Sequence, residues 1–360
     1  MKSNICARVA GKRRVFRATA LSIGAATLLA ACGSSTTASS SSPSTSSAAS
    51  TTSAPVSVTL AKAVNIEPFA VPNVAQSLGY FKKEGLNVKT VTVAGSVVAT
   101  TALESGSVQF ILASPSAVML AKAKGIPLLS VGEIEKNSDL QLVVSNAWIK
   151  AHHLSPTQPL TQIIKGLEGS KDATLSTTDK AAMKQFEQVA GVPSSSISEV
   201  SMNSASAMEA ALEHNLAQEF ILSPPDPQIM QAAGLATVLA SVAQLPYQSN
   251  IPFTLLITTP SYAKAHPTVV SKMVKAFQKA VTQMSKGSSG AVAALQPLYP
   301  TLKPAVIKSS LLSLPLNPSM QQTQTGWKNA LIGSQKTGLV PANDNVNISE
   351  GSLWTNQFLG

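Results

Sequence analysis

Arginine is absent beyond residue 17, and this absence limits how the chain can bind anions. A bound anion must be held by lysine, hydroxyl groups, amides or helix N-termini, because no guanidinium fork is present to grip it. The formal net charge is +10, but six of the cationic side chains precede residue 18. The rest of the chain carries 21 lysines against 17 acidic residues, a net charge of +4. The high isoelectric point therefore reflects the N-terminal segment, and we expect no nucleic-acid partner.

Cysteine is equally scarce, since only Cys6 and Cys32 occur. A disulfide framework and a cysteine metal site are excluded from the folded part, which must rest on a hydrophobic core. His152, His153 and His214 lack partner ligands at metal spacing. No nucleophile elbow, Walker loop or Rossmann fingerprint occurs either. We therefore expect no catalytic residue, no metal and no cofactor, and a protein that is not an enzyme.

The N-terminal segment predicts export from the cytoplasm. Residues 1–31 begin with basic side chains, continue with an apolar run from Ala18, and end in Leu29-Ala30-Ala31-Cys32. This pattern is typical of a secretory signal, and its end resembles a bacterial lipobox, which implies cleavage before Cys32 and lipidation of its thiol. An ordinary signal with an incidental cysteine is the alternative. Lys12-Arg13-Arg14 also resembles a twin-arginine signal, so export by Sec or Tat is expected.

Residues 32–55 consist almost entirely of Ser, Thr and Ala after the cysteine. Such a segment cannot bury a core, and as a flexible tether its root-mean-square span would be about 25–30 Å. No later apolar stripe reaches the roughly 18 residues that a membrane span needs. The predicted location is the cell envelope, with the lipid as the only membrane anchor, facing the periplasm or the exterior.

The segment Gly79–Gly132 predicts the architecture of the first lobe. Strands are expected at 86–93, 108–112 and 126–131, with helices between them, as in a βαβαβ run. Such strands run parallel, with helices packed on the sheet. Ligands bind at the carboxyl ends of the strands in these sheets. Those ends carry Gly95, Ser96, Ser114 and Ser116.

A second lobe repeats this plan. FILASP at 110–115 returns as FILSPP at 220–225, with similar spacing of the neighbouring elements; coincidence in Ala/Ser-rich sequence is the alternative. The predicted fold class is α/β, with two lobes that are each a mostly parallel sheet flanked by helices. The expected boundaries are 56–146 and 252–345 for lobe one, 147–251 for lobe two, and 346–360 for a C-terminal tail. Two crossovers, near 146–155 and 243–252, would form a hinge.

The strand ends of both lobes supply the candidate binding residues. Hydroxyls and amides at helix starts favour a negative group, although simple N-capping explains each one alone. The second lobe offers Ser176, Thr177, Thr178, Asn203 and Ser204. Phe69 and Tyr247 are candidates to flank an apolar part of the ligand, with core packing as the alternative. Glu67 and Asp226 are candidates to bind an amine or to repel anions, with a solvated loop as the alternative, and Asn65 is a further candidate beside Glu67.

Three segments carry a resemblance to a known family: GYFKKEGLNV at 79–88, ALESGSVQF at 102–110 and ASPSA at 113–117. They resemble solute-binding proteins of nitrate/sulfonate/taurine-type ABC importers, a group that includes thiamine-precursor-binding proteins. The resemblance covers roughly residues 56–345. It implies a type II periplasmic-binding-protein-like fold, a monomer that closes on a small anionic organic solute and delivers it to a permease. Asn65 and Glu67 stand where many members show an aromatic residue.

Two other functions stay open. Related folds include pyrimidine-synthesising enzymes that consume a bound pyridoxal cofactor, but these need a cysteine-rich iron site that the mature chain lacks. A sensor module that presents its ligand to a receptor is the third possibility. A neighbouring permease gene would favour import, and a neighbouring receptor gene would favour sensing.

Overall fold

The computed structural model describes residues 54–63, 66–93 and 95–360. Residues 52–360 belong to one compact unit. The predicted signal, the lipidation site Cys32, most of the tether and the candidate Asn65 lie outside the described residues.

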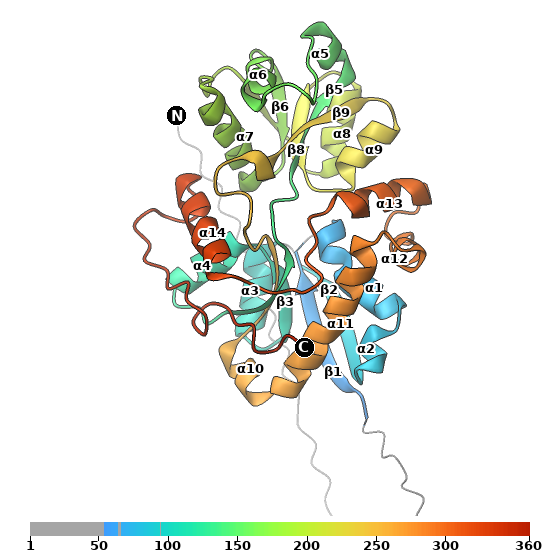
Figure 1. The fold of residues 1–360 in the computed structure, drawn as a ribbon, viewed down its shortest axis with the longest axis vertical. Coiled ribbons are helices and arrows are strands. Elements are labelled where there is room, and N and C mark those ends of the chain that lie inside the picture. Colours follow the sequence, from blue (N-terminus) through green and yellow to red (C-terminus); the bar gives the residue numbers. More distant parts are fainter. Residues whose placement is uncertain (1–53, 64–65, 94) are drawn as a thin grey trace, which may run out of the picture. The chain divides into compact units, whose positions relative to one another are not determined.

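Two five-stranded sheets, each flanked by helices, form this unit (Figure 1). The first sheet has the order β2-β1-β3-β10-β4, and the second has the order β7-β6-β8-β5-β9. The bounds are β1 Val56–Lys62, β2 Leu86–Thr92, β3 Phe110–Ala113, β4 Leu129–Glu135, β5 Gln141–Ser145, β6 Lys171–Thr174, β7 Ser198–Ser201, β8 Glu219–Leu222, β9 Ala236–Ser241 and β10 Thr254–Thr258.

The two sheets have the same plan, which confirms the predicted repeat. FILA forms β3 and FIL ends β8, and both strands take the third place in their sheets. Three strands of each sheet pair in parallel, as predicted. The fourth strand runs antiparallel to both of its neighbours: β10 lies between β3 and β4, and β5 lies between β8 and β9. β4 is therefore parallel in direction to β3 but does not pair with it.

The strand at 141–145 was assigned to the first lobe, and this assignment was wrong. β5 pairs with β8 and β9 of the second sheet. The first crossing is consequently the short segment 136–140, and not 146–155. A continuous apolar strand fits the interior of either sheet, so its pattern could not show which sheet it joins. The second crossing, at 242–253, agrees with the predicted 243–252.

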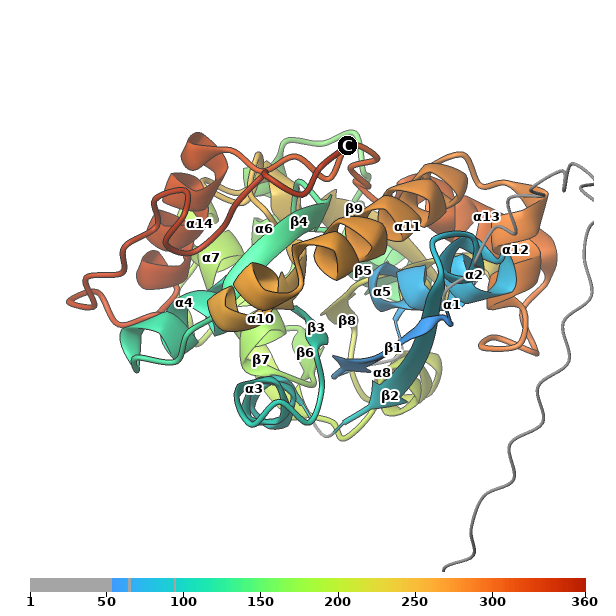
Figure 2. The same ribbon diagram turned by 90° about the horizontal axis from the view of Figure 1, so that it is seen from below.

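Helices cover both faces of each sheet (Figure 2). One face of the first sheet packs against η1 Glu67–Ala70, α1 Val71–Ser77, α2 Tyr80–Lys83, α10 Pro260–Ala265, α11 Pro267–Ser285, α12 Ser289–Leu295 and α13 Pro304–Ser313. Its other face packs against α3 Ser96–Glu104, α4 Pro115–Ala123 and α14 Gln324–Lys336. In the second lobe, α5 Asn146–Ala151, α6 Leu160–Lys165 and α7 Thr177–Ala190 lie on one face. α8 Ala205–Glu213 and α9 Asp226–Ala232 lie on the other, and η2 Val242–Gln244 opens the second crossing. None of the helices within the described ranges is long and apolar enough to cross a membrane.

The residues from Val71 to Lys83 form two short helices and not one continuous helix. Gly79 adopts a left-handed φ of 69° and separates α1 from α2. Glycine reaches this conformation without the steric cost that a side chain would add.

Residues 346–360, expected to be a separate tail, pack onto the first lobe. The amide of Ser130 donates to the carbonyl of Leu353 at 2.9 Å, and the amide of Thr355 donates back to Ser130 at 2.9 Å. Leu353 and Trp354 are buried with the core residues of β3, α4 and α14. The Trp354 indole also donates to the carbonyl of Ile348 at 2.9 Å.

We predict that Trp354→Ala lowers the free energy of unfolding by about 3–5 kcal/mol, because it leaves a large cavity beside the sheet. Urea denaturation measures the change. Leu312→Ala is the matched control, since the Leu312 side chain is 55% exposed, and it should shift stability by less than about 0.5 kcal/mol. Equal effects of the two substitutions would show that the C-terminal segment does not contribute to the core.

Candidate ligand site

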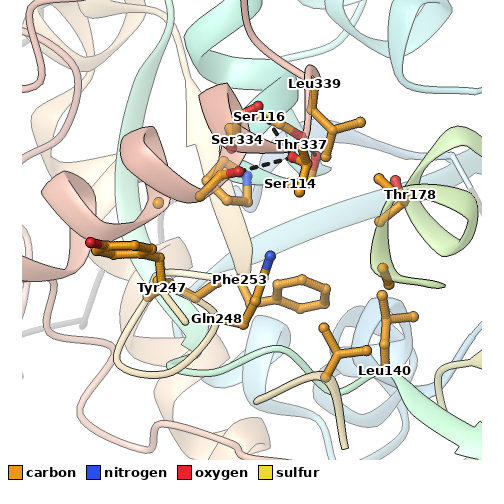
Figure 3. Close-up of a pocket in the computed structure, with 17 residues that line it drawn as sticks. Ser114, Ser116, Leu140, Thr178, Tyr247, Gln248, Phe253, Ser334, Thr337 and Leu339 are labelled. Atoms are coloured by element: carbon orange, nitrogen blue, oxygen red, sulfur yellow. Dashed lines mark hydrogen bonds between the residues drawn. The ribbon is translucent and has the colours of Figure 1, made fainter. Parts of the chain in front are cut away.

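Two adjoining cavities lie between the lobes, at the carboxyl ends of their strands. The outer cavity, about 290 Å³, is bounded by the starts of α3 and α4 from the first lobe and of α7 from the second. The inner cavity, about 60 Å³, extends towards the second crossing and α14 (Figure 3). The two share Ser114, Ser116, Thr178 and Leu339. This is where ligand binding is expected in open α/β sheets.

Two helix starts of the first lobe are built by short polar turns. Gly95 precedes α3 with a φ of 91°, and it offers no side chain to cap the helix. Ser114 precedes α4, where its hydroxyl accepts from the amide of Ala117 at 3.4 Å. The same hydroxyl lies 3.1 Å from that of Ser116. Ser96, Ser114 and Ser116 therefore line the outer cavity together.

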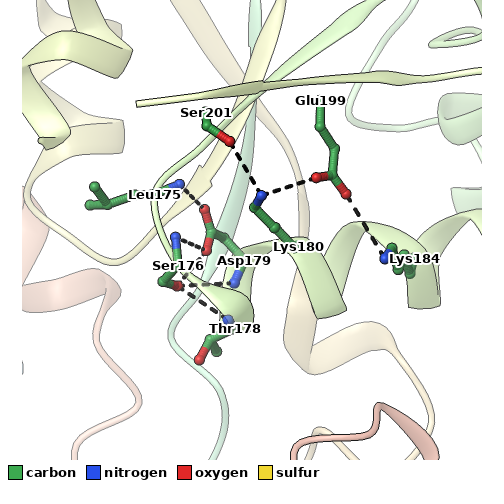
Figure 4. A network of polar contacts seen from close by, with 8 residues as sticks. All are labelled: Leu175, Ser176, Thr178, Asp179, Lys180, Lys184, Glu199 and Ser201. Atoms are coloured by element: carbon green, nitrogen blue, oxygen red, sulfur yellow. Dashed lines mark hydrogen bonds and ion pairs between the residues drawn. The ribbon is translucent and has the colours of Figure 1, made fainter. Parts of the chain in front are cut away.

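The α7 start is fixed by a capping box (Figure 4). The Ser176 hydroxyl accepts from the amides of Thr178 and Asp179 at 3.2 and 3.4 Å. The Asp179 carboxylate accepts from the amides of Leu175 and Ser176 at 2.6 and 2.7 Å, and also from the Ser176 hydroxyl. Such reciprocal bonds satisfy amides that a helix start leaves unpaired. The rigid cap holds Thr177 and Thr178 at the cavity wall.

The electrostatic character of the cavities suits a negative group. Lys124 is the only charged residue among those that line them, and no carboxylate is present there. Each helix start adds a partial positive charge, equivalent to about half an elementary charge, which the Asp179 carboxylate offsets at the start of α7. Three starts from two lobes thus face one space. The outer cavity also has an apolar wall, which includes Val97, Leu120 and Ile126.

The inner cavity is closed by residues that the sequence analysis missed. α14 and the turn after it contribute Gly333, Ser334, Thr337 and Leu339, and the second crossing contributes Gln248 beside Tyr247. A Cβ atom at Gly333 would lie only 3.0 Å from the Tyr247 carbonyl oxygen. A glycine inside an otherwise regular helix was the one available signal, since it often marks a close backbone approach.

The predicted site residues fall into separate groups. Ser96, Ser114, Ser116, Thr177, Thr178 and Tyr247 line the cavities, with Gly95 and Ser176 as the adjoining caps. Asn203 and Ser204 do not line them: Ser204 caps α8, accepting from the Ala207 amide at 3.1 Å. α8 follows β7, which is an edge strand, so its start lies away from the shared space. Phe69 packs against the core of the first lobe instead of flanking a ligand.

Glu67 and Asp226 belong to a buried acidic region beside the first crossing. Glu67 is fully buried, and one of its oxygens accepts from the Ser310 hydroxyl at 2.6 Å. Its amide donates across the lobes to the carbonyl of Pro224 at 3.4 Å. The FILSPP edge of the second lobe therefore meets Glu67 of the first lobe. Burial raises the pKa of Glu67 to about 8 and that of Asp226 to about 6.

Two more carboxyl groups flank the first crossing. The Glu135 carboxylate, at the end of β4, accepts from the Thr254 hydroxyl at 2.5 Å. Asp139, just before β5, accepts from the Ser223 hydroxyl at 2.8 Å. Burial raises the pKa of Asp139 to about 7, and burial together with the nearby Asp139 raises the pKa of Glu135. These four acidic side chains, Glu67, Asp226, Glu135 and Asp139, thus lie near the first crossing and do not line the cavities.

The two lobes and the order of their strands give the fold of the periplasmic binding proteins. The structure is similar to the periplasmic aliphatic sulphonate binding protein SsuA from Escherichia coli, with a TM-score of 0.63, 17% identity and coverage of 85% of this chain and 99% of that one. It is similar to the alkanesulfonate-binding protein SsuA from Xanthomonas axonopodis pv. citri bound to MOPS, with a TM-score of 0.59, 16% identity and coverage of 80% of this chain and 96% of that one. It is also similar to the periplasmic nitrate-binding protein NrtA from Synechocystis PCC 6803, with a TM-score of 0.58, 14% identity and coverage of 80% of this chain and 83% of that one.

The sequence identifies the family more narrowly. The NMT1/THI5 like family model matches residues 68–287, which is more than half of the chain, so the protein belongs to the NMT1/THI5-like family. No curated protein sequence shows significant similarity to the chain. The described residues contain no group of three or more His, Cys, Asp or Glu side chains that could hold a metal ion.

We predict that stability falls as pH rises from about 4.5 to about 8, partly through Glu67. Its pKa is about 8 in the folded chain and near its ordinary value of 4.5 when unfolded. In this interval the folded state keeps a proton that the unfolded state has lost, so Glu67 alone lowers stability by up to about 1.4 kcal/mol per pH unit. Glu67→Gln removes that slope while keeping an acceptor for Ser310.

Urea denaturation at pH 5, 6.5 and 8 tests this dependence. The exposed Glu104→Gln is the matched control and should leave the slope as it is. A slope that is the same in Glu67→Gln and in the parent protein would mean that Glu67 is ionised in the folded state.

Proposed function

We propose that this protein is the extracytoplasmic solute-binding component of an ABC importer. It captures a small organic anion between its lobes, closes about the two crossings and presents the solute to a permease. Cys32 carries the lipid anchor in this proposal, and the folded chain acts as a monomer without catalysis. One observation carries the proposal: three helix starts from two lobes face one space that has a lysine but no carboxylate.

The cavity chemistry supports a particular class of solute. Helix starts, hydroxyls and Lys124 can hold a sulfonate or carboxylate without a guanidinium group. The apolar wall formed by Val97, Leu120 and Ile126 favours an anion with a short hydrocarbon part over a bare inorganic ion such as nitrate. The volume of the outer cavity, about 290 Å³, is close to the lower end of the range for small-molecule sites, roughly 300–1,000 Å³.

Closure would follow from differential binding. A ligand that contacts α3 and α4 from one lobe and α7 from the other is held by both only when the lobes approach. Binding therefore shifts the population towards the closed form. A permease that prefers the closed form would then engage the loaded protein rather than the empty one.

A melting-temperature screen identifies the solute. At 100 times its dissociation constant a ligand should stabilise the protein by about 2.7 kcal/mol, which raises Tm by ~5 °C. Alkanesulfonates, taurine, aromatic carboxylates, nitrate, bicarbonate and thiamine precursors form the test set, and we expect the largest shift from an organic sulfonate or carboxylate. The absence of any shift, together with product formation from pyridoxal phosphate, would replace the transport proposal with the enzymatic one.

We further predict that Ser114→Ala weakens binding of the solute that the screen identifies by about tenfold, through loss of a charge-assisted hydrogen bond. It should also cost about 1 kcal/mol of stability, because Ser114 caps α4. Ser204→Ala is the matched control: it removes the cap of another nine-residue helix, outside the cavities. Isothermal titration should show the affinity loss only for Ser114→Ala, and equal losses in both variants would move the site elsewhere.

A further inference from the structure

A stripe of lysines runs along one helix of the first lobe. Lys272, Lys275, Lys279 and Lys286 follow one another along α11 and its C-terminal end at spacings of three, four and seven residues. At 100° per residue these positions share one face, and they extend over about 21 Å. α2 packs beside α11, where the rings of Phe81 and Phe277 lie 6.1 Å apart (Figure 2).

The adjoining helix α2 carries Lys82 and Lys83, and we call these two and the four lysines of the stripe the lysine face. Glu84 pairs with two of these lysines: its carboxylate accepts from Lys279 at 2.6 Å and lies 3.8 Å from the Lys275 ammonium nitrogen. The lysine face therefore keeps a charge of about +5, and Lys82, Lys83, Lys275 and Lys286 are exposed.

The surrounding sequence provides nothing to neutralise this charge. No aspartate or glutamate occurs between Asp226 and Asp344, whereas nine lysines do. Lysines of the second lobe are placed differently: Lys180 and Lys184 pair with Glu199 at 3.1 and 4.0 Å.

The described chain begins beside this face. The amide of Val56, the first residue of β1, donates to the carbonyl of Gly85 at 2.9 Å. Gly85 in turn adjoins the stripe, since a Cβ atom there would lie 3.7 Å from the Lys272 ammonium nitrogen. Val56 therefore lies at the edge of the lysine face. Only 23 residues separate Cys32 from Val56, a reach of at most ~80 Å.

We propose that the lysine face lies against the anionic headgroups of the membrane that holds the protein. This proposal rests on the lipid anchor at Cys32 that is part of the proposed function. An anchor keeps the face within a short distance of the headgroups, where each lysine gains attraction to anionic lipid. The contact orients the first lobe on the bilayer, with the solute cavities on other elements, α3, α4, α7 and α14, left uncovered.

Vesicle flotation tests the contact without the lipid. The exported chain from residue 32 onward, carrying Cys32→Ser so that no acyl group contributes, is mixed with vesicles of phosphatidylcholine alone or with 30% phosphatidylglycerol. We expect binding only to the anionic vesicles and its loss in 1 M salt, where the Debye length is about 3 Å. The triple variant Lys82→Gln, Lys275→Gln, Lys286→Gln should bind about 100-fold more weakly, at roughly fivefold for each lysine.

A second triple variant is the matched control. Lys150→Gln, Lys165→Gln, Lys328→Gln removes the same charge from exposed positions elsewhere and should lower vesicle affinity less than about tenfold, through net charge alone. Circular dichroism first verifies that both variants are folded. Three results would each overturn the proposal: binding to neutral vesicles as tight as to anionic ones, the same loss of affinity in both triple variants, or no binding to either kind of vesicle. An acidic protein partner for this face would give the last of these results.

Amine acylation of the lipidated protein in the same vesicles gives an independent readout. Lys275 and Lys286 should be protected in anionic vesicles and reactive in neutral ones, while Lys150 should react in both. Equal reactivity of all three lysines in both vesicles would also contradict the proposal. None of these measurements involves the solute, so a failure here is separate from a failure of the binding screen.

Discussion

Each sheet depends on a strand that the chain inserts after crossing between the lobes. β5 enters the second sheet before the chain has built the rest of it, and β10 returns to the first sheet after the second is complete. Because both inserted strands are antiparallel and pair on both sides, neither lobe can form an intact sheet without a crossing. The crossings are therefore anchored at both ends by buried strands. This constraint places the carboxyl ends of both sheets towards each other and creates the space in which the solute would bind.

The same constraint separates two kinds of polar group. Hydroxyls and helix starts gather at the outer and inner cavities, whereas buried carboxyls gather at the first crossing, where Glu135 and Asp139 each accept from a hydroxyl. Ionised carboxyl groups would repel an anion if they lined the cavity, and their position at the crossing keeps them away from it. Burial raises the pKa of Glu67 and Asp139 to about 8 and about 7. The charge state of the crossing consequently changes within the ordinary pH range, whereas the residues that line the cavities include no carboxyl group and no histidine.

The sequence predicted the architecture well where the signal was local. Alternating strands, helix stops at glycine and the FILASP repeat were sufficient to predict two α/β lobes, and the Ser and Thr residues at three helix starts line one cavity. Assignment of β5 failed because strand pairing is a long-range property: an apolar run shows burial and carries no information on its neighbours. Phe69, Asn203 and Ser204 were predicted to contact the ligand, but they do not line the cavities. A residue type near a strand end does not show which side of the sheet edge its side chain occupies. The walls from α14 were missed for a related reason, since their small polar residues are unremarkable in a surface helix.

Residues that lie far apart in the sequence meet at the cavities. Ser96 and Leu339, both in the wall of the outer cavity, are separated by more than two-thirds of the sequence. A chain truncated before α14 therefore lacks the α14 wall of the inner cavity and Leu339 of the outer one, although the starts of α3, α4 and α7 all precede that point. Contacts of such long sequence separation form slowly. We therefore expect the inner cavity to be completed late in folding, when α14 docks.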